Sequence, residues 1–103
     1  MRFEWEENKI IRNRRKHGGV SFELAALVFQ DDDLLIDRDR VDEIGEQRWH
    51  AIGIAQIAPK PPAVLFVVHV YKEDWNGEEV VRIISARKAN KNDIRRYKEQ
   101  AVD

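Results

Sequence analysis

The sequence predicts a single α+β domain made of two N-terminal helices, a four-stranded antiparallel sheet and a C-terminal helix. Three observations carry this prediction. The length of 103 residues suits one domain of ordinary size. Apolar residues between positions 22 and 29 repeat at helical spacing. From residue 47 onward, β-branched and aromatic residues dominate three runs, which turn-forming residues separate.

The two N-terminal helices are predicted from their ends. Glu6-Glu7 place negative charge where a helix N-terminus favours it, and the stretch that follows ends at Lys16, before Gly18-Gly19. Ser21 then predicts the N-cap of a second helix. Its apolar side has members three, four and seven positions apart: Phe22, Ala25, Ala26 and Phe29.

Four strands and a last helix follow. The strands are predicted at residues 34–37, 48–57, 63–71 and 80–86. A proline-rich loop at 59–62 separates the second strand from the third. Asn90 or Asn92 can cap the C-terminal helix, whose apolar side is formed by Ile94, Tyr97 and Ala101.

Asn76-Gly77 is a strong hairpin signal and predicts a two-residue turn between the last two strands. This turn would place Tyr71 opposite Arg82 and His69 opposite Ile84, so that a phosphate would fit between His69 and Arg82. The predicted buried face carries Val64, Phe66, Val68, Val70, Val81, Ile83 and Ser85. The predicted outer face carries Val67, His69, Tyr71, Arg82 and Ile84.

Composition excludes several classes of protein. The chain has no cysteine, which removes disulfides, thiolate nucleophiles and cysteine-ligated metal sites. The longest apolar run, residues 63–68, is far shorter than the ~20 residues of a membrane helix, and the acidic N-terminus does not resemble a signal peptide. We therefore expect a soluble, cytoplasmic protein that does not insert into membranes.

Charge is segregated along the chain although the net charge is only -1. Residues 1–20 carry +3 and residues 82–103 carry +4, whereas residues 21–47 carry -7. The basic segments can form one phosphate-binding face, or they can be an uneven but solvated surface. Three consecutive aspartates, at 31–33, cannot all point at one metal ion, and the sequence predicts neither a metal site nor a cofactor.

A set of short motifs resembles the BrnT family of type II toxins. The motifs are Phe3-Glu4-Trp5, Asn8-Lys9, Asn13, Lys16-His17-Gly18, Val20-Ser21-Phe22-Glu23, Ala26, Val28-Phe29, Glu46-x-Arg48-Trp49, Ile52-Gly53, Val67-Val68 and Arg82-Ile83-Ile84-Ser85-Ala86-Arg87-x-Ala89. The resemblance implies a ribonuclease with a fold similar to that of the RelE toxins, neutralised by a partner antitoxin, BrnA. Two departures from the family pattern are an extra glycine at Gly18-Gly19 and Asn92-Asp93-Ile94 in the last helix.

RNA cleavage without a metal uses the 2′-hydroxyl as nucleophile, so the protein must supply a base, an acid and positive charge. Arg48, Arg82 and Arg87 are the candidate charge donors because a guanidinium matches two phosphate oxygens. Each of them could instead be a surface arginine paired with a carboxylate. His69 is the first candidate for proton transfer and His50 the second. His69 could instead be a half-buried strand histidine with a purely structural role.

Three further residues are predicted to bind substrate. Tyr71 could bind phosphate or stack on a base, or it could simply pack across the strands against Arg82. Lys16 and His17 could act only on the dipole of the first helix. The resemblance to BrnT toxins favours a role for both in substrate binding.

The predicted function is therefore an endoribonuclease toxin that cleaves RNA without a metal and is held inactive by a BrnA-like, DNA-binding antitoxin. Homo-oligomers could form through that antitoxin. A basic antitoxin would be steered toward acidic residues such as Asp31, Asp32, Asp37 and Asp39. The alternative is a non-catalytic module that binds RNA or protein on the same scaffold.

Overall fold

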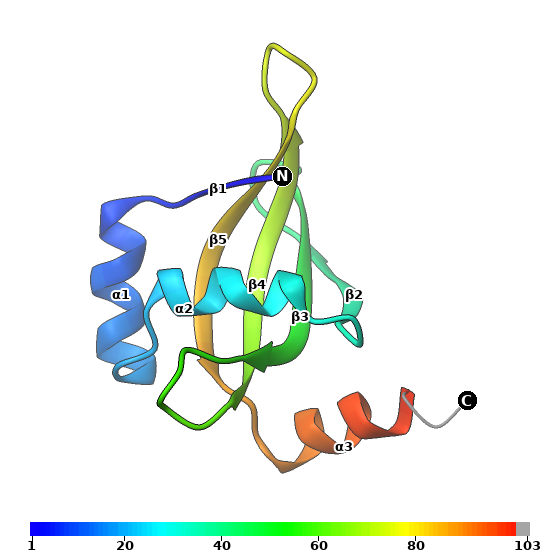
Figure 1. Ribbon diagram of the computed structural model, residues 1–103. Helices are drawn as coiled ribbons and strands as arrows, with labels where there is room; N and C mark the ends of the chain where they lie inside the picture. The colour runs from blue at the N-terminus through cyan, green and yellow to red at the C-terminus, as the bar shows by residue number, and fades with distance from the viewer. Residues whose placement is uncertain (101–103) are drawn as a thin grey trace.

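The computed structural model describes residues 1–100 and confirms the predicted α+β class (Figure 1). Within these residues, the elements in chain order are β1 (Arg2–Glu4), α1 (Glu7–His17), α2 (Phe22–Ala26), η1 (Leu27–Gln30), β2 (Leu35–Val41), β3 (Gln47–Ala55), β4 (Ala63–Glu73), β5 (Glu79–Lys88) and α3 (Lys91–Gln100). η1 is a 3-10 turn that continues α2. Ala101, which was expected in the last helix, lies outside the described residues.

The sheet of residues 1–100 has five strands, one more than predicted, in the order β1-β5-β4-β3-β2. The additional strand, β1, runs parallel to β5 and pairs Phe3 with Val81. The other neighbouring strands pair antiparallel, as predicted. β1 has only three residues, which is too short for an alternating pattern to reveal it.

Both N-terminal helices begin where the sequence predicts and α1 also ends there, whereas α2 ends at Ala26, before Phe29, and continues as η1. α1 ends at His17, and its C-cap Gly18 has a positive φ of 73°, which glycine adopts readily. The Ser21 hydroxyl accepts a hydrogen bond from the backbone N–H of Leu24 at 3.1 Å and so caps α2. Figure 1 shows α2 crossing the sheet, α1 beside β5, and α3 at the end of the sheet opposite the β4–β5 turn.

The β4–β5 register differs from the predicted one near the turn. Tyr71 lies opposite Val81 and His69 opposite Ile83, because the turn has three residues between Asp74 and Glu78 rather than two. Beyond His69 a β-bulge adds Ile84 to β5, and the predicted register holds from Val68–Ser85 onward.

The change of register reverses the predicted faces of β4, whereas Val81 and Ile83 of β5 are buried as predicted. Val81 and Ile83 lie on the same side as Leu65, Val67 and His69, and α2 and η1 pack against this side. His69 is therefore in the core, with an exposed fraction of 0%, and not on the outer face. Val64, Phe66 and Val68 point to the opposite side of the sheet and are only half-buried there. Within residues 1–100, no helix is long and apolar enough to cross a membrane.

Candidate functional site

A basic cleft of about 310 Å³ lies between α1, the β2–β3 hairpin and the bulge of β5. Ten residues line it: Lys9, Arg12, Asn13, Lys16, His17, Arg40, Glu43, Arg48, Ile84 and Ser85. Five of these carry a fixed positive charge, and Glu43 is the one carboxylate among them. We call this site the basic cleft, and its net charge suits a phosphate backbone.

α1 supplies one wall. Lys9, Arg12 and Lys16 are three and four residues apart, so they share one side of the helix. Asn13 holds this wall in place, since its Oδ1 accepts a hydrogen bond from the backbone N–H of Ala86 at 2.9 Å. Its Nδ2 donates to the carbonyl of Val20 at 3.3 Å. The Asn13 side chain thus ties α1 both to β5 and to the segment that leads into α2.

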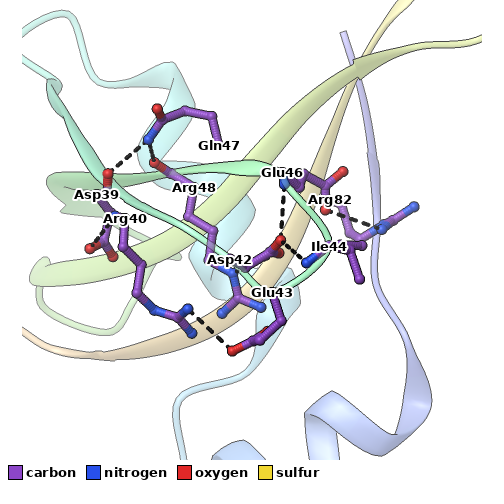
Figure 2. A network of polar contacts seen from close by, with 9 residues as sticks. All are labelled: Asp39, Arg40, Asp42, Glu43, Ile44, Glu46, Gln47, Arg48 and Arg82. Carbon is purple, nitrogen blue, oxygen red and sulfur yellow. Dashed lines mark hydrogen bonds and ion pairs between the residues drawn. The ribbon is translucent and has the colours of Figure 1, made fainter.

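A β-bulge in the β2–β3 hairpin supplies the facing wall. Arg38 pairs with Trp49 and Val41 with Gln47, so that Asp39 and Arg40 together oppose Arg48. The Gln47 side chain bridges this bulge. Its Nε2 donates to the carbonyl of Asp39 at 2.7 Å and to the carbonyl of Arg48 at 2.8 Å. The bulge brings Arg40 and Arg48 to the same cleft (Figure 2).

The turn that follows β2 pairs these arginines with carboxylates. Arg48 Nε lies 3.4 Å from Asp42 Oδ2, and Arg40 Nη1 lies 3.4 Å from Glu43 Oε1. Figure 2 shows Asp42 inside the turn, where it accepts from the N–H groups of Ile44 and Glu46. These hydrogen bonds lower the pKa of Asp42, and the one from Glu46 has the largest effect. Burial acts in the opposite direction, whereas the contact with Arg48 lowers the pKa further.

Lys16, His17 and Arg48, which were predicted as site residues, all line the basic cleft. Arg82 lines a smaller adjoining hollow, which shares Arg48 with the cleft. Its guanidinium is held by two carboxylates, at 3.2 Å from Glu4 and at 4.0 Å from Glu46. The structure therefore gives Arg82 a clear structural role in linking β1, β5 and the β2–β3 turn.

Arg87 lies apart from the basic cleft. Its guanidinium is 2.7 Å from the carboxylate of Asp93 and 4.0 Å above the ring of Phe66. Asp93 also accepts from the N–H of Asn90, and Asn90 in turn accepts from the N–H of Asp93. Arg87 thus fastens the start of α3 to β5.

His69 and Tyr71 lie in a cluster of rings on the core side of the sheet. The imidazole of His69 meets the rings of Phe29 and Tyr71 edge-on, with centroids 4.9 Å away in both cases. Burial lowers the pKa of His69 to about 4, and neither ring nitrogen meets the geometry of a hydrogen bond within residues 1–100. Tyr71 packs against Trp49 and not across from Arg82. An imidazole so enclosed does not reach the basic cleft.

His50 and the aspartates have other partners. The His50 ring stacks on Phe66 at 5.0 Å, and its Nε2 lies 3.7 Å from the carboxylate of Asp37, which also pairs with Arg96. Asp31 accepts hydrogen bonds from the hydroxyl of Tyr97 at 2.6 Å and from the N–H of Ile54 at 2.8 Å. Asp31 is thus an anchor for α3, not a free docking charge. Within residues 1–100, no three His, Asp or Glu side chains are grouped as metal ligands.

Sequence reasoning missed Lys9, Arg12 and Arg40 as members of the cleft. The helical spacing of Lys9, Arg12 and Lys16 is a signal that could have found the α1 wall. Arg40 gives no such signal, because its direction depends on the bulge.

A family model described as "Ribonuclease toxin, BrnT, of type II toxin-antitoxin system" matches residues 5–93. This range contains every residue that lines the basic cleft. No curated protein and no solved structure matches the chain.

Proposed function

This chain belongs to the BrnT family of ribonuclease toxins of type II toxin-antitoxin systems, and we propose that it cleaves RNA in the basic cleft without a metal ion. A toxin of this type has a cognate antitoxin and an RNA substrate. The observation that carries the proposal is the convergence of five cationic side chains, from α1, β2 and β3, on one cleft.

The proposed reaction needs positive charge more than any other contribution. The 2′-hydroxyl of the substrate attacks the adjacent phosphorus, the bond to the 5′-oxygen breaks, and charge builds on the non-bridging oxygens. Arg48 is the proposed charge donor, since it lines the cleft, is 19% exposed and extends from a rigid strand. Lys9, Arg12 and Lys16 bind the flanking phosphates in this proposal.

His17 is the proposed proton-transfer group, because it is the histidine among the residues that line the cleft. It takes the proton from the 2′-hydroxyl or returns one to the departing 5′-oxygen. His69 is left out of the proposed chemistry because it is enclosed in the core. Arg82 and Arg87 are proposed to support the site, through the carboxylates that hold them.

The test is cleavage of single-stranded RNA by the purified chain in the presence of EDTA. Arg48→Ala should lower the rate by about 10²-fold, the usual cost of losing one donor to a developing oxyanion. Arg95→Ala is the matched control, because Arg95 is exposed on α3 and outside the cleft. Loss of cleavage on chelation, with rescue by Mg²⁺, would show that a metal is required. Salt-sensitive RNA binding without any cleavage would favour the non-catalytic module.

The proposal extends to the type of antitoxin and to the surface that it contacts. We propose a BrnA-like, DNA-binding antitoxin, through which toxin copies are brought together, and action in the cytoplasm. Its basic surface would approach Asp32 and Asp39, which are exposed, whereas Asp31 and Asp37 already have partners within the chain. Asp32→Lys combined with Asp39→Lys should slow association with the antitoxin at low salt, and an unchanged on-rate would contradict this approach.

A further inference from the structure

Two turns of this protein are built in the same way. The segments Asp42–Glu46 and Asp74–Glu78 both read Asp-x-x-Gly-Glu. In each, the aspartate Oδ1 accepts two backbone N–H groups, at 3.1 and 2.9 Å in the first turn and at 2.9 and 3.0 Å in the second. The glycines have φ values of 84° and 79°. In both turns, therefore, the aspartate stabilises the turn by accepting these backbone N–H groups with Oδ1.

The second carboxylate oxygen has a different partner in each turn. Asp74 Oδ2 lies 3.3 Å from Nη2 of Arg2, near the start of the chain. Asp42 Oδ2 lies 3.4 Å from Nε of Arg48, which lines the basic cleft. The Asp42 side chain is only 4% exposed, so water competes little for this contact.

Holding Arg48 by Nε has a geometric consequence. A guanidinium presents two edges that can each bind a pair of oxygens, and the edge formed by Nη1 and Nη2 stays free when a carboxylate occupies Nε. Within residues 1–100, Asp42 is the one carboxylate within 4.0 Å of Arg48. This edge is therefore the one left to bind a phosphate.

We propose that Asp42 is a positioning residue that holds Arg48 in the orientation required for RNA cleavage, a role that rests on the function proposed above. The negative charge of Asp42 and its position beside Arg48 have opposite effects on the proposed reaction. As a negative charge beside the cleft, Asp42 weakens RNA binding. As a fixed acceptor for Nε, it aims the guanidinium at the reacting phosphate.

This opposition makes the proposal testable with Asp42→Asn. Asparagine keeps the oxygen that accepts the two turn N–H groups, but it replaces Oδ2 with an amide that cannot accept from Arg48. We expect the single-turnover rate at saturating RNA to fall by about tenfold or more. The Kd for RNA should stay the same or become tighter, because a negative charge has been removed.

Asp74→Asn is the matched control, since it makes the same change in the equivalent turn, away from the cleft. It should shift the melting temperature about as much as Asp42→Asn does and leave the cleavage rate within twofold. If Asp42→Asn does not fold, Asp42→Ser replaces it, because a serine hydroxyl can also accept the turn N–H groups.

Arg48→Ala and the double variant complete the cycle. If Asp42 acts through Arg48, Asp42→Asn should have no further effect on the rate in the Arg48→Ala background. A wild-type rate for Asp42→Asn beside a slow Arg48→Ala would overturn the positioning role and leave the proposed function standing. An equal loss in both backgrounds would also overturn it, because Asp42 would then act on something else. A wild-type rate for Arg48→Ala would overturn both proposals.

Discussion

Replacing Asn13 with alanine should detach α1 from β5 and destabilise the protein by about 3 kcal/mol. Asn13 is 3% exposed, and its removal leaves two buried backbone groups without partners. Loss of the hydrogen bond to the Ala86 N–H, at 2.9 Å, should lower the free energy of unfolding by about 2 kcal/mol. Loss of the weaker one to the Val20 carbonyl, at 3.3 Å, should lower it by about 1 kcal/mol. For a domain of this size, the sum corresponds to a fall in Tm of roughly 15 °C.

Denaturant unfolding measures the loss, and Asn8→Ala is the control. Asn8 is an exposed residue of the same helix, so this substitution makes the same change of side chain and brings the same gain in helix propensity of about 0.5 kcal/mol. Hydrogen exchange of the Ala86 amide gives a local readout, because this N–H should exchange much faster in Asn13→Ala. Equal stability of the two variants, with the Ala86 amide still protected, would refute the idea that this side chain fastens the helix.

Three other predictions concern stability and binding. Because burial lowers the pKa of His69 to about 4 from an ordinary value of 6.5, the unfolded chain takes up this proton first as the pH falls. Wild type should therefore lose about 3 kcal/mol more than His69→Leu between pH 6.5 and 4 in urea titrations, and parallel pH profiles would refute this. Burial alone would raise the pKa of Asp31, but hydrogen bonds from Tyr97 and two backbone N–H groups lower it, so this contribution to stability is lost as the pH falls below about 4. Tyr97→Phe should accordingly be less stable than wild type at pH 7 by about 1–2 kcal/mol, and the difference should shrink at pH 3; a difference independent of pH would refute this. The logarithm of the RNA affinity should fall with the logarithm of the salt concentration, with a slope of about -2 or steeper if three or more cations of the cleft contact phosphates, and an affinity independent of salt would refute phosphate binding there.

Local signals were enough to predict most of the elements. Ser21 and Gly18 mark helix ends through their own backbone and side-chain chemistry, which needs no distant partner. The β-branched runs predicted β3, β4 and β5 to within about two residues, because strand preference is a property of the run itself.

Non-local contacts explain what the sequence could not predict. The register error came from the turn, where Asn76-Gly77 suggested two residues but the Asp74 carboxylate holds three between the strands. The bulge at Ile84 lies beside the hydrogen bond from the Ala86 N–H to Asn13, a residue 73 positions earlier. No local pattern reports such a contact.

The candidate site was predicted less accurately than the fold, because it too depends on non-local contacts. A change of one residue in register moves a strand side chain to the other face of a sheet, and this moved His69 from the predicted outer face into the core. Arg48 and Lys16 were found because their types and the family motifs point to them. Arg40 was not found, because the bulge that turns it toward the cleft is settled by pairing between strands.

The attachment of α1 to β5 also sets an order of events during synthesis. α1 is among the first segments to leave the ribosome, but the backbone group that Asn13 binds belongs to Ala86, and the cleft residues Ile84 and Ser85 lie beside it. Chain elongation proceeds at about 5–20 residues per second, so α1 waits several seconds for the strand on which it docks. Until β5 has emerged, α1 has no strand on which to dock, and the cleft lacks Ile84 and Ser85 between its two walls. A nascent chain of this toxin therefore cannot assemble the basic cleft while it is still short, and a translating ribosome carries the unfinished chain without a formed cleft beside its own RNA.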